Sequence, residues 1–283
     1  MTTNWHGYYI NLDSSPERRA LLEETIMRAG LAGLYERFPA RTGREKPADC
    51  LLAPGEYGCF CSHHDLLASV QPDGRFVHVL EDDAIVARVF GPAVQSMLDR
   101  GMLEPFDIVF TETMIKMNLG HIRDVKSLFD RNFVPGKPLS LTLIGLGGDS
   151  FMGTTSYFVN PRSLGRVVDA LKRGLDAGPL KPLDHYYCDE ARAGRLKIGL
   201  VFPFLSSIRV QMPSTIRLDS AIEMALLLLR NTFFIEADIQ ANRRALANIF
   251  RQTTPSQPDP RLDFISDFLR FTVANPGASE GKE

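Results

Sequence analysis

The stretch Phe76-Val-His-Val-Leu-Glu-Asp-Asp83 decides the fold, because an apolar strand here runs directly into three consecutive carboxylates. A strand can bury its apolar residues in a sheet, but three ionised groups at its end must face water, a cation or a cationic partner. Carboxylate oxygens are hard ligands that suit Mn²⁺ or Mg²⁺, and these ions commonly link a carboxylate to substrate phosphates. The alternative is a strand end whose acids cap the next helix, and this segment alone leaves both interpretations open.

Strands and helices alternate on both sides of this stretch. A strand is expected at residues 8–13, followed by a helix that Ser15 caps, Pro16 begins and Gly30 ends. Further strands are expected at 35–40, 107–113, 154–160 and 197–204, and further helices at 54–68, 92–100, 161–175 and from 184. This alternation predicts an α/β fold with a mostly parallel sheet covered on both faces. Ligands of such sheets bind beyond the carboxyl ends of the strands, where the three acids lie.

Composition excludes several classes of protein. The chain has 283 residues, enough for one large domain with a helical extension, and its 32 basic and 34 acidic residues give a net charge of −2, which argues against a nucleic-acid binder. Because the start of the chain lacks a signal-peptide pattern and no apolar run reaches the ~20 residues of a membrane span, a cytoplasmic protein is expected. Cys59 and Cys61 are two residues apart, which is neither the redox nor the zinc spacing, so reduced thiols are expected.

Two further carboxylates are candidates for acid–base chemistry. Asp184 opens a predicted helix after the turn at residues 178–182, where it is either a simple N-cap or a general base at the same sheet edge as the metal. Asp149 is the second candidate. It lies in the irregular segment 114–150, which is typical of a binding loop or lid, and its Gly145-Leu-Gly-Gly-Asp-Ser150 context matches a dinucleotide fingerprint only in part.

Six short motifs, taken in order, resemble glycosyltransferase family 25, which contains bacterial lipooligosaccharide galactosyltransferases and collagen galactosyltransferases. The motifs are Tyr9-Ile-Asn-Leu-Asp-Ser-Ser-Pro-Glu-Arg-Arg19, Phe38-Pro-Ala-Arg-Thr-Gly43, Leu52-Ala-Pro-Gly-Glu-Tyr-Gly-Cys-Phe-Cys-Ser-His63, Val79-Leu-Glu-Asp-Asp83, Gly153-Thr-Thr-Ser-Tyr157 and Pro182-Leu-Asp-His185. Pro213-Ser-Thr-Ile216 is similar to the closing segment of the family. Their order and spacing are more specific than any single motif.

The resemblance implies a GT-A type, Rossmann-like fold, a UDP-sugar donor and inversion at the anomeric carbon. It implies that Asp83 and Asp82 hold Mn²⁺ (or Mg²⁺) on the donor diphosphate. The residues expected on the donor side are Asn11, Leu12, Arg18, Arg19, Glu81 and Asp82. Asp184 is then the expected catalytic base, with Asp149 second. The implied reaction moves a sugar, galactose in the leading interpretation, onto a saccharide or glycolipid acceptor of a surface glycan; the alternative is a non-catalytic sugar-binding or scaffold module.

The chain after Ile216 is expected to be helical. The sequence therefore predicts a transferase domain at 1–216, a helical extension at 217–273 and a frayed tail at 274–283. Leu226 to Leu229 and Phe233-Phe-Ile235 form apolar stripes interrupted by Arg230 and Asn231. Such stripes suit a core helix, a homodimer face or a weak contact with the inner face of a membrane.

Overall fold

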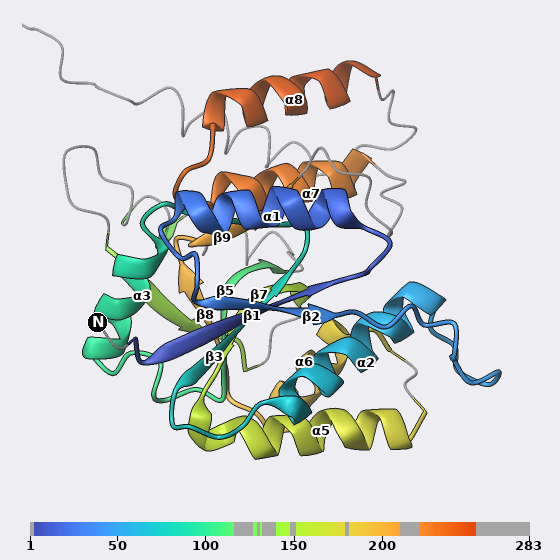
Figure 1. Ribbon diagram of the computed structural model, residues 1–283. Coiled ribbons are helices and arrows are strands. Elements are labelled where there is room, and N and C mark those ends of the chain that lie inside the picture. Colours follow the sequence, from blue (N-terminus) through green and yellow to red (C-terminus); the bar gives the residue numbers. More distant parts are fainter. Residues whose placement is uncertain are drawn as a thin grey trace, which may run out of the picture.

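The computed structural model is an α/β fold built around one mixed sheet (Figure 1). The residues it describes are 3–115, 127–128, 131, 140–147, 151–178, 181–209 and 221–252. Asp149 and the segment Pro213 to Ile216 therefore lie outside the described residues.

Each strand and helix that the sequence predicts is present, but the short strands Ala84–Val86, Thr142–Gly145 and Ser206–Ile208 lie outside the predicted set, and the second of them lies in the segment 114–150 expected to be irregular. The strands are β1 (Trp5–Asn11), β2 (Tyr35–Pro39), β3 (Phe76–Glu81), β4 (Ala84–Val86), β5 (Ile108–Ile115), β6 (Thr142–Gly145), β7 (Phe151–Val159), β8 (Ile198–Phe202) and β9 (Ser206–Ile208). The helices are α1 (Pro16–Arg28), α2 (Pro54–Ser69), α3 (Phe90–Asp99), α5 (Leu164–Asp176), α6 (Leu183–Arg192), α7 (Ala221–Thr232) and α8 (Ile239–Gln252). A 3-10 turn, Pro161–Ser163, leads into α5.

The main sheet has the strand order β2-β1-β3-β7-β5-β8-β6 among the described residues. β1 pairs in parallel with β2 and β3, and β5 pairs in parallel with β8. β7 is antiparallel to both β3 and β5, and β6 is antiparallel to β8. The other strands share one direction, so the predicted α/β, Rossmann-like fold with a mostly parallel sheet is confirmed. The short strands β4 and β9 pair separately.

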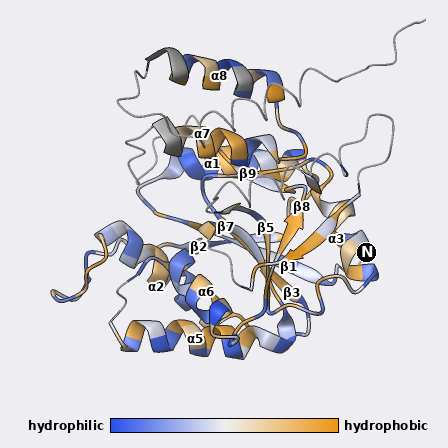
Figure 2. Cartoon of the chain, turned by 180° about the vertical axis from the view of Figure 1, so that it is seen from behind, coloured by the Kyte–Doolittle hydropathy of each residue, from blue (hydrophilic) through white to orange (hydrophobic). Residues whose placement is uncertain are grey.

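Helices cover both faces of the sheet, with α1, α7 and α8 on one side and α2, α5 and α6 on the other (Figure 1). Alternate residues of β3 enter two different cores, since Val77 and Val79 belong to one cluster and Phe76 and Leu80 to the other. Burial on both faces explains why this strand reads as a continuous apolar run. Figure 2 shows the same division, with hydrophobic central strands and mixed colours along the covering helices.

The first strand, turn and helix follow directly from local sequence. α1 begins at Pro16, whose fixed φ suits the first helical position, and it ends at Arg28. Gly30 then adopts a φ of 68°, a left-handed conformation that glycine adopts without steric cost. Because β1 and β3 are parallel neighbours, the turn after β1 and the start of α1 lie beside the carboxyl end of β3.

The described residues after position 220, 221–252, form the helices α7 and α8, as predicted, and α7 packs against the sheet. α7 contacts β5 and β9, and α8 packs on α7. Leu227, Leu228, Leu229 and Phe233 are buried within the chain, which favours the core alternative for this apolar stripe. The predicted boundary at residue 216, the segment 253–273 and the tail 274–283 lie outside the described residues. Within the described part of the chain, no helix combines the length and apolarity needed to cross a membrane.

Candidate active site

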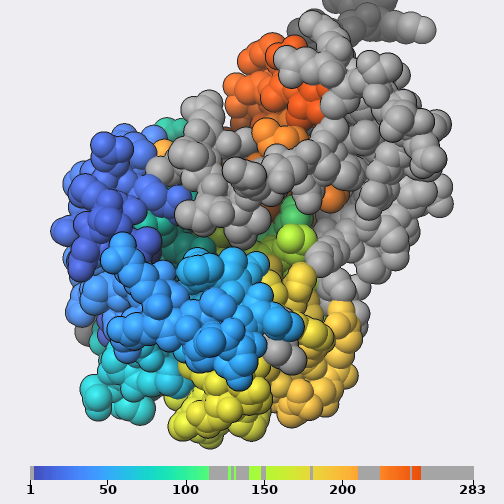
Figure 3. Space-filling view, turned by 90° about the vertical axis from the view of Figure 1, so that its right-hand side faces the viewer, coloured from blue at the N-terminus to red at the C-terminus, as the bar shows by residue number. Residues whose placement is uncertain are grey.

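The carboxyl end of β3 is the centre of the candidate site. β3 ends at Glu81, and Asp82 and Asp83 form the turn into β4. The parallel neighbour β1 ends at Asn11, with Ile10 in register with Glu81, while the antiparallel neighbour β7 begins nearby, with Ser156 opposite Leu80. Figure 3 views the molecule from the side on which β1 and β2 end, and teal and green residues are visible there in a recess bordered by the blue N-terminal part.

Asp82 connects the three segments that meet at this edge. Its side chain accepts hydrogen bonds from Asn11 Nδ2 on Oδ2 and from Arg18 Nε on Oδ1, both at 2.7 Å, and Arg18 Nη2 also contacts Oδ1. Asp82 is 8% exposed. Because both oxygens already bind protein groups, Asp82 orients the Arg18 guanidinium at the edge of the site. Asp82 does not cap a helix, because the turn at residues 82–83 leads into the strand β4.

Asp83 is the carboxylate that the protein leaves without full compensation. Its buried Oδ1 has no hydrogen-bond partner among the described residues, and its Oδ2 lies 3.4 Å from Arg18 Nη2. Burial, followed by the charge of Glu81, raises the pKa of Asp83 to about 7. A buried carboxylate oxygen without a partner fits a divalent cation, whose charge would favour the ionised form. The residues present therefore fit the Mn²⁺ or Mg²⁺ that the sequence predicts, with Asp83 as the protein ligand.

Glu81 differs from Asp83 because both a hydroxyl and an imidazole lie close to its carboxylate. Thr154 Oγ1 donates a hydrogen bond to Glu81 Oε1 at 2.6 Å, and His63 Nε2 lies 3.4 Å from the same oxygen. Burial raises the pKa of Glu81, but the contacts with His63 and Thr154 outweigh it, and the pKa is lowered overall. Glu81 is thus a fixed negative charge beside Asp83.

Asp184 reaches this edge from the first turn of α6. Its Oδ2 accepts the Gly153 backbone N–H at 2.8 Å, and its Oδ1 accepts the His185 N–H at 2.7 Å. Gly153 precedes Thr154, the residue that binds Glu81, so β7 links Asp184 to the acidic cluster. Burial raises the pKa of the Cys59 thiol, and the charges of Glu81, Asp184 and Asp83 raise it further.

Arg230 of α7 is a site residue that sequence reasoning did not identify. Its guanidinium donates to both oxygens of Glu112 in β5 and lies 3.4 Å from Thr155 Oγ1. The same guanidinium packs on Gly153, where an added Cβ would lie 3.0 Å from Nη2. Its charge lowers the pKa of both Glu81 and Asp83, although burial has the larger effect on each. The only signal in the sequence is an arginine that directly follows the apolar run 225–229.

The remaining predicted donor residues, Arg19 and Leu12, have local contacts in α1 and in the turn after β1. Arg19 points along α1, where its Nε binds Glu23 Oε1 at 2.8 Å, and its side chain is 46% exposed. Leu12 is partly exposed in the turn after β1, where its carbonyl accepts the Ser15 N–H at 3.0 Å. Roles for both residues on the donor remain predictions, as does a catalytic role for Asp149.

Two glycines of the sequence motifs have a packing role. Gly58 of α2 lies against the loop at 41–43, and a Cβ there would lie 2.5 Å from the Arg41 carbonyl oxygen. Gly43, with a φ of 70°, lies so close to Pro54 that an added Cβ would overlap its carbonyl. Close approach of two backbones therefore explains these positions without a contact to substrate.

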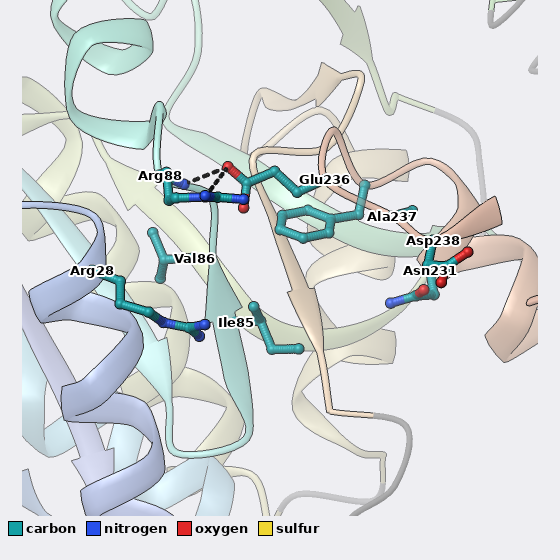
Figure 4. A pocket seen from close by; sticks show the side chains of 9 residues that line it. Arg28, Ile85, Val86, Arg88, Asn231, Glu236, Ala237 and Asp238 are labelled. Atoms are coloured by element: carbon teal, nitrogen blue, oxygen red, sulfur yellow. Dashed lines mark hydrogen bonds and ion pairs between the residues drawn. The ribbon is translucent and has the colours of Figure 1, made fainter. Parts of the chain in front are cut away.

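Two cavities lie away from the acidic cluster. One of about 320 Å³ lies between the end of α1, β4 and the connection from α7 to α8 (Figure 4), where the Arg88 N–H donates to Glu236 at 2.8 Å. A second, of about 180 Å³, lies beside α2 and is lined by Arg41, Thr42, Gly43, Glu45, Tyr57, Cys61 and Asp65. The candidate site is identified by its converging polar groups and not by cavity volume.

Comparison with known proteins agrees with this geometry. Residues 4–177 match the family described as glycosyltransferase family 25 (LPS biosynthesis protein). A protein of Drosophila pseudoobscura pseudoobscura named "Glycosyltransferase 25 family member" is 34% identical over 98 residues, a match that covers 28% of this chain and 15% of that protein. The matched residues span β1 to the end of α5 and include the acidic turn after β3. The chain belongs to glycosyltransferase family 25.

Proposed function

We propose that this chain is a metal-dependent, inverting glycosyltransferase that moves galactose from UDP-galactose onto a saccharide acceptor of a surface glycan. The observation that carries the proposal is the buried Oδ1 of Asp83, which has no hydrogen-bond partner within the described part of the chain and lies next to an arginine held by Asp82, itself bound by Asn11. A carboxylate with one oxygen left without a hydrogen-bond partner, beside a fixed guanidinium, suits a cation and a diphosphate together.

The chemistry requires compensation of charge on the leaving diphosphate. A divalent cation bound by Asp83 would supply Lewis-acid stabilisation of that charge. Arg18 supplies the second positive charge. Its Nε is bound to Asp82 and its Nη2 contacts both Asp82 and Asp83, so the guanidinium is held beside the proposed cation site. Both charges favour departure of the diphosphate as the sugar becomes electron-deficient.

Inversion requires a base that removes the proton of the acceptor hydroxyl on the face opposite the leaving group. We assign this role to Asp184. Two backbone N–H groups, those of Gly153 and His185, bind its two oxygens and fix the orientation of the carboxylate. Each oxygen keeps a further lone pair that can accept the hydroxyl proton. Asp149 is the alternative base.

The family description supports the proposed class of acceptor. The family description names LPS biosynthesis, which agrees with a saccharide or glycolipid acceptor of a bacterial surface glycan. The match covers only 15% of the fruit-fly relative, so the activity of that protein is not carried over to this chain. An acceptor on a lipid would bring the enzyme to the cytoplasmic face of a membrane.

A panel of UDP-sugars incubated with Mn²⁺ tests the proposal, with release of UDP as the measured quantity. Slow hydrolysis of UDP-galactose that requires Mn²⁺ and exceeds hydrolysis of the other donors is the expected result. Mn²⁺-dependent binding of UDP-sugars without hydrolysis or transfer would instead support the non-catalytic binding module. Hydrolysis of a different sugar nucleotide would keep the transferase and replace the donor.

A further inference from the structure

A second cluster of metal-binding side chains lies behind the acidic edge. Cys59 Sγ, His63 Nε2 and a carboxylate oxygen of Glu81 all lie within 4.8 Å of one another. Cys59 and His63 are four residues apart in α2, so both side chains project from the same face of the helix toward the end of β3. Cys59 and Cys61 are neighbours in the sequence, but the structure places the side chain of Cys59 beside that of His63.

His63 has the arrangement of a metal-binding imidazole. It is 1% exposed, and its ring stacks on Tyr157, whose hydroxyl lies 2.7 Å from Nδ1. Its Nε2 makes no hydrogen bond that satisfies geometric criteria among the described residues and lies 3.4 Å from Glu81 Oε1. Metal-bound histidines commonly engage their other ring nitrogen in this way, which fixes the ring and directs the free nitrogen at the ion.

The ring nitrogen that carries the proton of His63 decides whether the contact between Nε2 and Glu81 is favourable. If Nδ1 carries the proton and donates to Tyr157, the lone pair of Nε2 faces the negative oxygen of Glu81. That arrangement is unfavourable unless a cation lies between the two atoms. If Tyr157 donates to Nδ1 instead, Nε2 carries the proton and points at Glu81 without an ion. Metal binding and an empty cluster thus require opposite tautomers of one buried histidine.

The geometry points to a site for Zn²⁺, which we infer is formed by Cys59, His63 and Glu81 and is separate from the hard-cation site at Asp83. One thiolate, one imidazole and one carboxylate are the donor set that zinc accepts, and three protein ligands leave a fourth position open. Neighbouring ligand atoms of a tetrahedral zinc site lie roughly 3.3–3.6 Å apart, given bonds of about 2.0–2.3 Å. The His63 to Glu81 separation of 3.4 Å already fits. Cys59 Sγ lies within 4.8 Å of both atoms, a separation that a rotation of its short side chain can adjust.

Zinc binding would release the proton of the Cys59 thiol and would change the contacts of Glu81. Burial raises the pKa of the Cys59 thiol, so the free thiol is neutral, and zinc must displace its proton to form the zinc–thiolate bond. The proton leaves to solvent, and no redox change occurs. Zinc would also take the Glu81 oxygen that now accepts from Thr154. Because Glu81 lies next to Asp83, zinc bound here should inhibit turnover.

Cobalt titration of the metal-free full-length chain tests the inference, because a cobalt–thiolate bond absorbs in the near ultraviolet and reports on cysteine without any activity measurement. A saturable absorption band that Zn²⁺ abolishes is expected for the wild type. Cys61→Ser, two residues away in the same helix, should keep the band. Cys59→Ser should lose it, and His63→Gln should weaken zinc binding by about tenfold or more.

Three outcomes would overturn the inference: no band in the wild type, a band that survives in Cys59→Ser, or a band that Cys61→Ser removes. The wild-type titration remains decisive even if a variant fails to fold. Asp83→Asn separates this site from the proposed function, because it should keep the cobalt band while it loses Mn²⁺-dependent binding of UDP. Loss of manganese dependence together with an intact band would show that the two sites are distinct.

Discussion

The guanidinium of Arg230 in α7 binds both carboxylate oxygens of Glu112 in β5, and the two residues are only 7% and 0% exposed. Residue 230 lies beyond the segment 4–177 that matches the family. The ion pair therefore joins the helical region after residue 220 to the sheet directly beside Gly153, whose N–H binds Asp184. We infer that α7 is part of the structure that supports the active site.

Removal of one member of this pair should destabilise the protein strongly. Arg230→Met leaves Glu112 as an unpaired buried charge, which costs about 3–5 kcal/mol in the free energy of unfolding. Arg230→Met with Glu112→Leu should recover most of that loss, since no buried charge remains. Urea denaturation of the single variants, the double variant and Arg244→Met, an exposed arginine of α8, measures this. A loss below about 1 kcal/mol for Arg230→Met would contradict the expected role.

Arg18 and Arg19 are adjacent in sequence but face different partners, which makes them a matched pair. Arg18→Lys removes the Nε–H that binds Asp82 and should weaken UDP binding about tenfold, or about 1.4 kcal/mol. Arg19→Lys should change the affinity less than twofold, because Arg19 binds Glu23 on the exposed side of α1. Calorimetric titration with UDP and Mn²⁺ compares them. A larger loss for Arg19→Lys would reverse the assignment.

Asp184→Asn should separate binding from chemistry. The amide preserves the shape of the side chain but cannot accept the acceptor proton, so kcat should fall by about 10²- to 10⁴-fold while the UDP affinity stays unchanged. Asp189→Asn is the control, since Asp189 lies on the same helix and pairs with Lys181 at the surface. Steady-state kinetics with saturating donor measures the effect. Turnover close to that of the wild type would remove Asp184 as the base.

His78 should make the fold sensitive to acid. Burial lowers its pKa from 6.5 to about 3 in the folded chain, where its ring contacts Tyr35 and Ser156. The unfolded chain binds a proton below pH 6.5 and the folded chain does not, so stability falls as the pH drops from about 6.5 toward 3. The loss between pH 7 and pH 5 should be about 2 kcal/mol.

The His78→Gln variant tests this pH dependence. Its stability at pH 7 is expected to be lower, because the hydrogen bonds of the imidazole are altered, but the decline between pH 7 and pH 5 should be smaller by about 2 kcal/mol. Urea denaturation at both pH values provides the comparison. Equal declines in the two proteins would show that His78 does not cause the acid sensitivity.

Local patterns in the sequence predicted the elements that depend on neighbouring residues. Pro16 and Gly30 bound a helix because their effects on φ act at their own positions, and the run from Phe76 to Glu81 is a strand because both of its faces are covered. Pairings between distant segments could not be predicted in this way. β4 and β9 have three residues each and pair across about 120 residues, and no periodicity can be read in so short a strand.

The same distinction applies to the candidate site. The sequence identified the three acids because they are consecutive, but it could not show that Asn11 and Arg18 occupy Asp82 and leave Asp83 without a full set of partners. Which carboxylate is satisfied depends on how β1, α1 and β3 meet in space. The contacts of His63 with Tyr157 and of Arg230 with Glu112 cross 94 and 118 residues, so spacing along the chain contains no sign of them.

The most direct test of the account is the manganese dependence of UDP binding to wild-type and Asp83→Asn protein, measured by calorimetry with and without Mn²⁺. The wild type should bind UDP at least about tenfold more tightly with Mn²⁺, a gain of about 1.4 kcal/mol, and Asp83→Asn should show no such gain. Asp176→Asn, an exposed acid that pairs with Lys172, should behave like the wild type. A full manganese effect in Asp83→Asn would contradict the claim that Asp83 holds the cation.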